Sequence, residues 1–385
     1  MTMWNFDDKT KFDENGLEIG KHNNYAINAH KCHTNMEIGA RGCGKTFPVL
    51  VMECVKKFID SGYHDQFAYV RRRKEERIKN QRKIFNGVVK SGWIEWYTSG
   101  EWDSIYFYQG NWFLRKTNEN GEEEARCPNP MGWAFDLSTS MNDKGPDYPD
   151  VRTIVFDEFI PLKGATKRYL TDEVDLWLNL ISTIDRGREQ CTIYMLANSI
   201  DPNGCPYFDY YGIDPDMLEQ GKIYVSNVTK KGKIAIEYCK EKGQGNADES
   251  VYFKVDDEVG AMIINGAWDI NRFPSLPKNY LDDIDNITIM TFFIYLKQGK
   301  IIRGRFLSTN TAVVYFDIYP EDKIPYDSML YVDQWYNDAI DDPRIRVGFS
   351  TSYKLDSHIL DMIQSNRAYY ESDSVGAKIQ NFLGV

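Results

Sequence analysis

A glycine-rich stretch near the amino end, Gly39-Ala40-Arg41-Gly42-Cys43-Gly44-Lys45-Thr46, fits the pattern G-x-x-x-x-G-K-[ST]. In that pattern the glycines let consecutive backbone N–H groups turn inward around phosphate oxygens, at the amino end of a helix whose dipole favours negative charge. The flanks agree, because residues 35–38 are typical of a strand and residues 47–59 carry apolar residues at helical spacing. We therefore expect a strand, a phosphate-binding loop and a helix. An ordinary glycine turn is the alternative.

All residues of this loop, the first half of a Walker-type site, are candidates for nucleotide binding, and two side chains have a defined role. Lys45 would reach the β- and γ-phosphates of ATP, and the Thr46 hydroxyl would complete the coordination of Mg²⁺, which prefers hard oxygen ligands. Arg41 lies inside the loop, where it would contact nucleotide or pair with Glu158 between turnovers. The expected cofactors are ATP and Mg²⁺.

A second candidate segment is a buried strand, residues 153–156, that ends in the adjacent acids Asp157 and Glu158. A parallel sheet gathers ligands at the carboxyl ends of its strands, so this pair should share an edge with the phosphate loop. Asp157 would hold Mg²⁺ through water, and Glu158 would orient and deprotonate the attacking water. That division of roles favours hydrolysis over transfer to another substrate. A solvated strand end is the alternative.

Three polar residues further along the chain are candidates for contacting the γ-phosphate. Arg186 and Arg188 follow an amphipathic helix that is expected to begin near Thr171 and to stop near Gly187. An arginine reaching a neighbouring subunit's γ-phosphate would stabilise the charge of the transition state. Asn198 follows a strand expected over residues 192–196, where its side chain could bond the γ-phosphate or water. Structural salt bridges for the arginines, and capping of the strand end for Asn198, are the alternatives.

Strands alternate with helices over the first 240 residues, which predicts a mostly parallel sheet covered by helices on both faces. A further strand is expected over residues 66–70, ending in a basic cluster at residues 71–74, and a polar helix should follow to about residue 90. Residues 93–137 have the short alternating segments of a β-rich insertion, with a hairpin around Gly110-Asn111.

The length and later composition of the chain predict a second domain. A chain of 385 residues exceeds the size at which one hydrophobic core usually stops growing. We expect an ATPase domain over residues 1–240, a linker over 241–282 that is rich in charged residues, Gly and Pro, and a small α/β domain over 283–385. Strands of that small domain are expected over 287–296 and 312–316.

The composition excludes several classes of protein. A net charge of −11 argues against a protein that coats nucleic acid over its whole surface, so any DNA contact must be local. No run of about eighteen apolar residues exists and the amino end is polar, which predicts an intracellular protein with no membrane partner. The seven cysteines contain no C-x-x-C pair, so neither a disulfide framework nor a zinc site is expected. The adjacent Cys32 and His33 lack a second ligand pair.

Three segments, residues 38–46, 132–160 and 178–199, together resemble the DNA-packaging ATPases of phi29-type tailed phages. That family lies in the FtsK/HerA-like part of the P-loop proteins, the division with an additional strand and a catalytic glutamate. The most telling pattern runs from Gly132-Trp133-Ala134 through Asp147-Tyr148-Pro149 to Ile160, because so long a shared pattern is unusual among generic ATPases.

The resemblance implies a homopentameric ring at the portal vertex of a procapsid in the host cytoplasm, which drives double-stranded DNA into the particle. ATP would bind between subunits, with Arg186 matching the arginine that acts in trans and Arg188 as the second candidate. A trans arginine needs a head-to-tail interface that closes into a ring, which agrees with this picture. The portal and capsid would be partners, and the participation of a packaging RNA stays open.

The resemblance also implies that the small domain is RNase H-like and vestigial as a nuclease. Only Asp317, at the end of residues 313–316, stands where a metal-binding carboxylate would, and two-metal chemistry needs several converging acids. No nuclease activity is expected. For DNA contact we choose loop residues on either side of the catalytic strand, which would bind phosphates without reading sequence, or which are simply solvated charges. These are Lys144, Lys163, Lys167 and Arg168.

Two other functions share the nucleotide motifs. One is a P-loop enzyme of another kind, such as a helicase, another translocase or a filamentous-phage assembly ATPase. The other is a structural or docking protein whose loop binds nucleotide without hydrolysing it.

Overall fold

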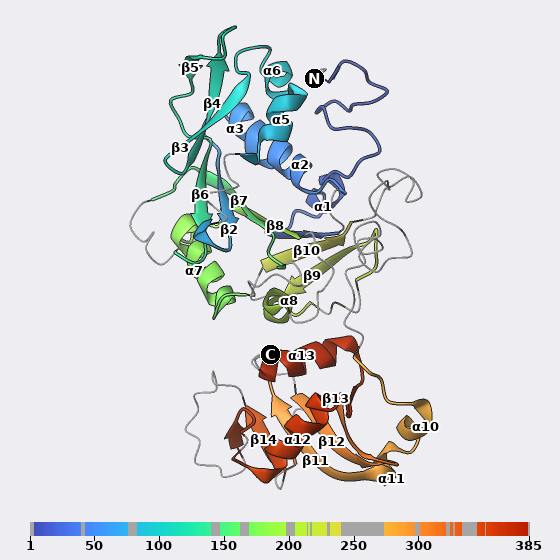
Figure 1. Cartoon of the computed structure of the whole chain (residues 1–385). Coiled ribbons are helices and arrows are strands. Elements are labelled where there is room, and N and C mark those ends of the chain that lie inside the picture. Colours follow the sequence, from blue (N-terminus) through green and yellow to red (C-terminus); the bar gives the residue numbers. More distant parts are fainter. Residues whose placement is uncertain are drawn as a thin grey trace. The chain divides into compact units, whose positions relative to one another are not determined.

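The computed structural model of the chain describes residues 4–39, 43–75, 83–139, 147–161, 169–197, 205–213, 215, 218–228, 232–239, 273–296, 301–320, 324–325, 328–332, 345–350 and 352–383. The chain divides into two compact units, residues 1–201 with 217–268, and residues 202–216 with 269–385 (Figure 1). Most of the predicted linker, residues 241–282, lies outside the described residues, so the predicted domain boundaries stay a prediction. Among the helices of the described part, none has the length and apolar character needed to cross a bilayer.

A ten-stranded sheet forms the first unit (Figure 1). Its strands are β1 (Thr34–Ile38), β2 (Gln66–Arg71), β3 (Ser104–Tyr108), β4 (Asn111–Thr117), β5 (Glu123–Arg126), β6 (Gly132–Asp136), β7 (Val151–Asp157), β8 (Thr192–Ala197), β9 (Ile223–Val228) and β10 (Gly232–Tyr238). Their order is β3-β4-β6-β2-β7-β8-β1-β10-β9, with β5 beside β4. The neighbours β6, β2, β7, β8, β1 and β10 are parallel, and the remaining pairs are antiparallel. The predicted mostly parallel sheet is confirmed.

Helices pack on both faces of this sheet. They are α1 (Tyr25–Asn28), the continuous segment α2 (Thr46–Pro48), η1 (Val49–Lys56) and α3 (Lys57–Asp60), then α5 (Asn86–Ser91), α6 (Trp93–Tyr97) and α7 (Glu173–Asp185). Successive residues of β7 point to opposite faces, as strand geometry requires. Val155 lies in the core shared with Val51 of η1, and the Phe156 ring packs on Trp177 of α7 with centroids 5.0 Å apart. The strand is therefore buried on both faces, which accounts for its continuous apolar run.

The segment predicted as a β-rich insertion differs from that prediction at both ends. It begins with a helix, α6, and it ends with β6, which is a parallel strand of the main sheet beside β2. The predicted hairpin is confirmed, because β3 and β4 pair around Gly110 and Asn111. Gly132 explains how β6 fits against β2, since a Cβ at that position would lie 2.3 Å from the Phe67 ring. A contact of this kind depends on distant residues, and local alternation cannot indicate it.

The second unit holds a six-stranded sheet. Its strands are β11 (Thr288–Tyr295), β12 (Ile301–Ser308), β13 (Ala312–Tyr319), β14 (Met329–Val332), β15 (Ile345–Val347) and β16 (Ala368–Tyr370), and its helices are α8 (Pro206–Tyr211), α10 (Lys278–Leu281), α11 (Ile284–Ile287), α12 (Lys354–Gln364) and α13 (Asp373–Leu383). The order is β15-β14-β11-β12-β13-β16. An antiparallel meander, β11-β12-β13, is extended beside its first strand by the parallel strands β14 and β15. This is the strand order of an RNase H-like sheet, in agreement with the predicted fold class.

Candidate functional site

The phosphate loop and the acidic pair lie at one edge of the first sheet, with a single strand between them. β8 pairs with β1 on one side and with β7 on the other. The carboxyl ends of β1, β8 and β7 lie side by side. Just beyond β1, Gly39 N donates to Ala197 O of β8 at 3.2 Å, and just beyond β7, Phe159 N donates to Leu196 O of β8 at 3.1 Å. The two segments predicted to form the nucleotide site are therefore brought together. The strand between them is the additional strand implied by the resemblance.

In the phosphate loop, the ammonium of Lys45 is folded back onto the loop itself. Its Nζ donates to the carbonyl of Gly39 at 2.9 Å and lies 3.2 Å from Cys43 Sγ, and the side chain is buried. Gly44 has a φ of +99°, a conformation that needs glycine. Thr46, partly buried, is the first residue of α2. The predicted ligands Ala40, Arg41 and Gly42 lie outside the described residues.

Cys43 has an acidic thiol in this arrangement. A hydrogen bond from Cys239 and the charge of Lys45 together lower the pKa of Cys43 to about 5. The thiol of Cys239 has its pKa raised, because it donates to Cys43 and is buried. All seven cysteines of the chain are free thiols.

The carboxylate of Asp157 is already paired with a cation inside the chain. Its Oδ2 accepts from the Tyr69 hydroxyl at 2.6 Å and from Arg71 Nη1 at 2.8 Å. The same Arg71 nitrogen lies 3.4 Å from Glu158 Oε2. Burial and the neighbouring carboxylates raise the pKa of Tyr69 well above its usual value, so its hydroxyl stays protonated and donates. Glu158 is the more accessible acid, with its side chain 38% exposed.

The backbone that follows the acids is held by Arg72. Its guanidinium donates to the carbonyls of Glu158 at 3.0 Å and Phe159 at 2.7 Å, and to the Glu173 carboxylate at 2.8 Å. It also lies over the Tyr169 ring, 5.2 Å from the centroid. Glu158 has a φ of +60°, which is unfavourable for a residue with a side chain, and these bonds stabilise the turn. Arg72 is thus a positioning residue for Glu158.

Sequence reasoning did not assign roles to Tyr69, Arg71 or Arg72. A signal was present, because the basic cluster at residues 71–74 ends a strand predicted to belong to the same sheet. The side chains of a parallel sheet converge at that edge, so a basic cluster there is placed to meet the acidic pair.

The two candidate arginines lie at the other end of α7 and differ in how firmly they are held. Arg188 Nη1 lies 3.0 Å from Asp147 Oδ1, and its Nη2 donates to the carbonyls of Tyr148 and Ile184 at 3.2 and 2.8 Å. Arg186 Nε lies 3.6 Å from the same Asp147 oxygen, and its side chain is 43% exposed. Arg188 therefore has a structural set of bonds, and Arg186 presents more of its guanidinium to solvent.

Both arginines are remote from the acidic pair of their own chain. Asp147 precedes Val151, the first residue of β7, and Asp157 is the last residue of that strand. A strand of this length spans about 20 Å. An arginine bound to Asp147 therefore lies near the amino end of β7, whereas Asp157 lies at its carboxyl end.

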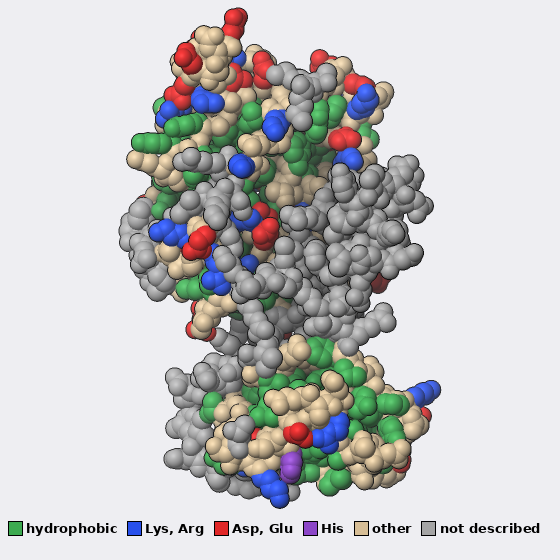
Figure 2. Space-filling view, in the orientation of Figure 1, with side chains coloured by type: hydrophobic (Ala, Val, Ile, Leu, Met, Phe, Trp, Pro, Cys, Tyr) green, Lys and Arg blue, Asp and Glu red, His purple; other side chains and the backbone are tan. Residues whose placement is uncertain are grey.

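The remaining predicted site residues are not described by the structure and stay predictions. Asn198 follows β8, which ends at Ala197. The predicted DNA contacts are Lys144, Lys163, Lys167 and Arg168. On the face in Figure 2, basic and acidic side chains of the described residues of the first unit are interspersed.

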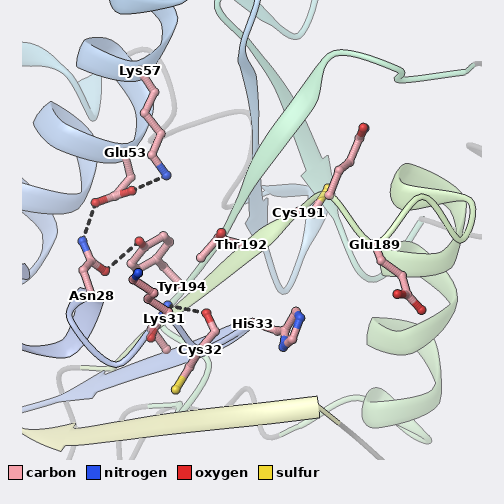
Figure 3. A pocket seen from close by; sticks show the side chains of 12 residues that line it. Asn28, Lys31, Cys32, His33, Glu53, Lys57, Glu189, Cys191, Thr192 and Tyr194 are labelled. Carbon is pink, nitrogen blue, oxygen red and sulfur yellow. Dashed lines mark hydrogen bonds and ion pairs between the residues drawn. The ribbon is translucent and has the colours of Figure 1, made fainter.

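A cavity of about 410 Å³ lies at the amino ends of β1 and β8, away from the phosphate loop (Figure 3). Its wall includes Cys32 and His33, and Glu53, which accepts from Asn28 Nδ2 at 2.7 Å and pairs with Lys57 at 2.6 Å. No potential metal cluster of the described residues includes Cys32 or His33. None of the predicted nucleotide-site residues lines this cavity.

In the second unit, Asp317 is engaged by two arginines of the neighbouring strand. Its carboxylate accepts from Arg303 Nε at 3.0 Å and from Arg305 Nη2 at 3.0 Å. The hydrogen bond and charge of Asp317 raise the pKa of Arg303. Two guanidinium groups occupy the positions from which metal ions would approach this carboxylate.

Comparison with known proteins confirms the resemblance seen in the sequence. Residues 128–246 match the family described as Podovirus DNA encapsidation protein (Gp16). The DNA packaging protein of Bacillus phage B103 is 33% identical over 190 residues, 49% of this chain and 51% of that protein. The DNA packaging protein of Bacillus phage phi29 is 34% identical over 190 residues, 49% of this chain and 49% of that protein. The chain spans about half the length of the curated relatives it matches.

Similar folds extend over nearly the whole chain. The bacteriophage Phi-29 viral genome packaging motor assembly has a TM-score of 0.63 at 20% identity, covering 94% of this chain and 99% of that chain. The Phi-28 gp11 DNA packaging motor has a TM-score of 0.60 at 17% identity, covering 94% of this chain and 98% of that chain. The predicted fold class, a P-loop sheet followed by a small α/β sheet, is confirmed.

Proposed function

We propose that this chain is an ATP-hydrolysing motor subunit that moves double-stranded DNA into a virus procapsid. The observation that carries the proposal is the level placement of the phosphate loop and the Asp157-Glu158 pair on either side of β8. The similarity to two Bacillus phage packaging proteins supports DNA as the substrate. The chain would act in the host cell at the portal of the procapsid.

In the proposed reaction ATP occupies the loop that Lys45 now covers. The Lys45 ammonium would leave the Gly39 carbonyl and contact the β- and γ-phosphates. Backbone N–H groups of the loop would bind the remaining phosphate oxygens. Thr46, and Asp157 through water, would hold Mg²⁺, which would supply positive charge beside the phosphates. The residues fit a hard oxygen-ligated cation, because a hydroxyl and a carboxylate are the available ligands and both follow strands that end at this side of the sheet.

Glu158 is proposed as the group that activates water. It is the exposed member of the acidic pair, and its backbone is fixed by Arg72. A carboxylate that orients and deprotonates water directs the chemistry towards hydrolysis. Asn198, at the end of β8, would complete the site by a hydrogen bond to the γ-phosphate or to this water.

A ring completes the site in trans. Arg186 lies at the sheet edge opposite Asp157 and is partly exposed, so it is proposed to reach the nucleotide of a neighbouring subunit. A head-to-tail contact of this kind closes into a ring, and we propose a pentamer. The ring would dock on the portal and capsid, with a packaging RNA as a further possible component of the same assembly.

DNA contact is assigned to the loops on either side of β7. Lys144, Lys163, Lys167 and Arg168 are proposed to bind phosphates, which carry no sequence information and suit translocation along any DNA. The domains are proposed as residues 1–240 for the ATPase, 241–282 for the linker and 283–385 for docking. Nuclease activity is not proposed, because Asp317 is held by Arg303 and Arg305.

The test is ATP turnover by the purified chain with and without linear double-stranded DNA. Turnover should rise with DNA, and Lys45→Ala and Glu158→Gln should each lower it by roughly 100-fold or more. Lys90→Ala and Glu119→Gln remove exposed charges elsewhere and serve as matched controls. Normal turnover in both site variants would overturn the proposal. Strand separation of a forked duplex would instead support a helicase, and nucleotide binding without turnover a docking protein.

A further inference from the structure

Three potential metal ligands from distant parts of the chain meet beside the phosphate loop. They are His22 from the amino-terminal arm, Glu237 of β10 and Cys239, which follows β10. One ligand atom from each lies within 4.8 Å of the other two, and this is the one such group in the described part of the chain. His22 also lies against the loop, since a Cβ on Gly44 would be 3.8 Å from the His22 Cβ.

The separations are close to those around a bound ion. His22 Nδ1 lies 3.9 Å from Glu237 Oε1, and Cys239 Sγ lies 3.8 Å from His22 Nε2. Ligands of one tetrahedral zinc ion lie roughly 3.3–3.7 Å apart, given metal–ligand bonds of about 2.0–2.3 Å. Because the ligand atoms lie within 4.8 Å of one another, metal binding to one ring nitrogen would require them to approach by up to roughly 1.5 Å.

A buried carboxylate orients the imidazole. Glu37 is fully buried on β1, and its Oε2 lies 2.7 Å from His22 Nε2. Metal-binding histidines usually donate their second ring N–H to a carboxylate in this way. Because Nε2 is engaged by Glu37, Nδ1 is left to bind the ion, and Cys239, whose Sγ now lies 3.8 Å from Nε2, would have to shift towards Nδ1.

The two carboxylates beside His22 also favour a bound cation. Glu37 and Glu237 are register partners on the adjacent parallel strands β1 and β10, so their side chains leave the same face of the sheet. Oε1 of Glu37 and Oε2 of Glu237 are buried and have no hydrogen-bond partner among the described residues. His22 and, for Glu37, Lys45 supply positive charge here, and a bound cation would also engage the two carboxylate oxygens that have no hydrogen-bond partner among those residues.

The ligand atoms of His22, Glu237 and Cys239 indicate which metal ion would bind. Nitrogen, sulfur and carboxylate oxygen together suit Zn²⁺, whereas Mg²⁺ prefers oxygen alone. Cys43 is the candidate for the fourth position, although it lies outside the group of three. A Cβ on Gly39 would lie 3.0 Å from Cys239 Cβ and 3.4 Å from Cys43 Sγ, so the two cysteine side chains approach the same point of the loop.

We propose that His22, Glu237 and Cys239, completed by Cys43, form a structural zinc site that ties the amino-terminal arm and β10 to the phosphate loop. The site has four protein ligands, as structural zinc sites do, and it is separate from the Mg²⁺ position at Thr46 and Asp157. Its ligands are widely spaced in the sequence, so the absence of a C-x-x-C pair does not exclude it.

The site can be tested without nucleotide and without measuring ATP turnover, so its failure would not affect the proposed function. The full chain is stripped of metal with a chelator, kept reduced, and titrated with Co²⁺ and then with Zn²⁺. We expect one equivalent of Co²⁺, a near-ultraviolet absorption band from thiolate bonded to cobalt, and loss of that band when Zn²⁺ displaces the cobalt. No thiolate band in the unaltered chain would overturn the proposal.

The Zn²⁺ affinities of substituted chains show which side chains bind the ion. Cys239→Ser and His22→Gln should each weaken Zn²⁺ binding by at least about 100-fold, measured by competition with a chelating dye, and Glu37→Gln by about 10-fold. Cys191→Ser removes a thiol outside the cluster and should bind Zn²⁺ normally. Unchanged affinity in Cys239→Ser would overturn the site. Unchanged affinity in Cys43→Ser would overturn the fourth ligand.

Discussion

Arg71, at the end of β2, places its Nη1 2.8 Å from Oδ2 of Asp157, at the end of β7. The two side chains are nearly buried, with 8% and 14% of their surface exposed. A cation thus already stands where the proposed Mg²⁺ would bring positive charge. Under the proposed function, Mg²⁺ and Arg71 would compete for the negative charge of Asp157, which would link β2 to nucleotide binding.

Removing this cation should destabilise the empty protein more than the nucleotide-bound protein. Arg71→Gln leaves a buried carboxylate without its charged partner, and we expect the free energy of unfolding to fall by about 3 kcal/mol. With Mg²⁺ and a non-hydrolysable ATP analogue the loss should shrink, because Mg²⁺ then neutralises Asp157. Urea unfolding with and without ligand measures both values, with the exposed Lys74→Gln as control. Equal losses in the two states would show that Arg71 never leaves Asp157.

Arg72 should affect the chemical step more than substrate binding. Arg72→Lys keeps the charge but cannot bond the carbonyls of Glu158 and Phe159 together with the Glu173 carboxylate. We expect kcat to fall roughly 10–100-fold with KM little changed, because Glu158 loses its fixed orientation. Steady-state kinetics on this variant and on Lys74→Ala give the comparison. A change confined to KM would mean that Arg72 acts on nucleotide binding.

ATP turnover by mixtures of two variants tests whether Arg186 acts on the nucleotide of a neighbouring subunit. Arg186→Ala and Lys45→Ala should each be inactive alone, and mixing them should recover part of the ATP turnover, because some interfaces then pair an intact loop with an intact arginine. Arg188→Ala should instead lower the melting temperature, since it loses bonds to Asp147, Tyr148 and Ile184. Mixtures that stay inactive at every ratio would assign Arg186 a structural role.

The turn that carries Arg186 should show a distinct pH dependence. Burial raises the pKa of Asp185, but hydrogen bonds from the backbone N–H groups of Glu189 and Gln190 outweigh it, and the pKa lies below the ordinary 3.8. An acid with a lowered folded pKa stabilises the fold above its ordinary pKa, and that stability is lost as the pH falls below it. Asp185→Asn should therefore cost about 1 kcal/mol at pH 7 and progressively less below about pH 4.

Unfolding curves from pH 7 to pH 3 test this expectation, with Asp175→Asn, an exposed acid of the same helix, as the reference. The curves of the unaltered chain and Asp185→Asn should converge at the acid end. A difference that stays constant down to pH 3 would contradict the lowered pKa.

The sequence predicted those parts of the site that depend on contiguous residues. The phosphate loop needs glycines, Lys45 and Thr46 in an unbroken run, and the acidic pair needs a buried strand directly before it. The mostly parallel sheet followed from alternating strands and helices. Each of these patterns is local, so the residues themselves carry the information.

Features that depend on distant pairing were not predicted. β6 was assigned to an insertion, because its partnership with β2 rests on the fit of Gly132 against Phe67. The roles of Arg71 and Arg72 depend on which strands lie side by side. In the second unit, β14, β15 and β16 were not predicted, since strands of three or four residues become recognisable only through their neighbours. β12 was also not predicted, although its eight residues make it as long as β11 and β13.

The fold-back of Lys45 onto the Gly39 carbonyl has a consequence for the speed of a cycle. Among the described residues, Lys45 and Asp157 each have a partner within the chain, so in the proposed cycle a nucleotide would replace contacts that can form again when it leaves. The free energy of nucleotide binding would then be the difference between two sets of contacts, which is smaller than either set alone. Under the proposed function, such a balance would favour release of the nucleotide after each cycle.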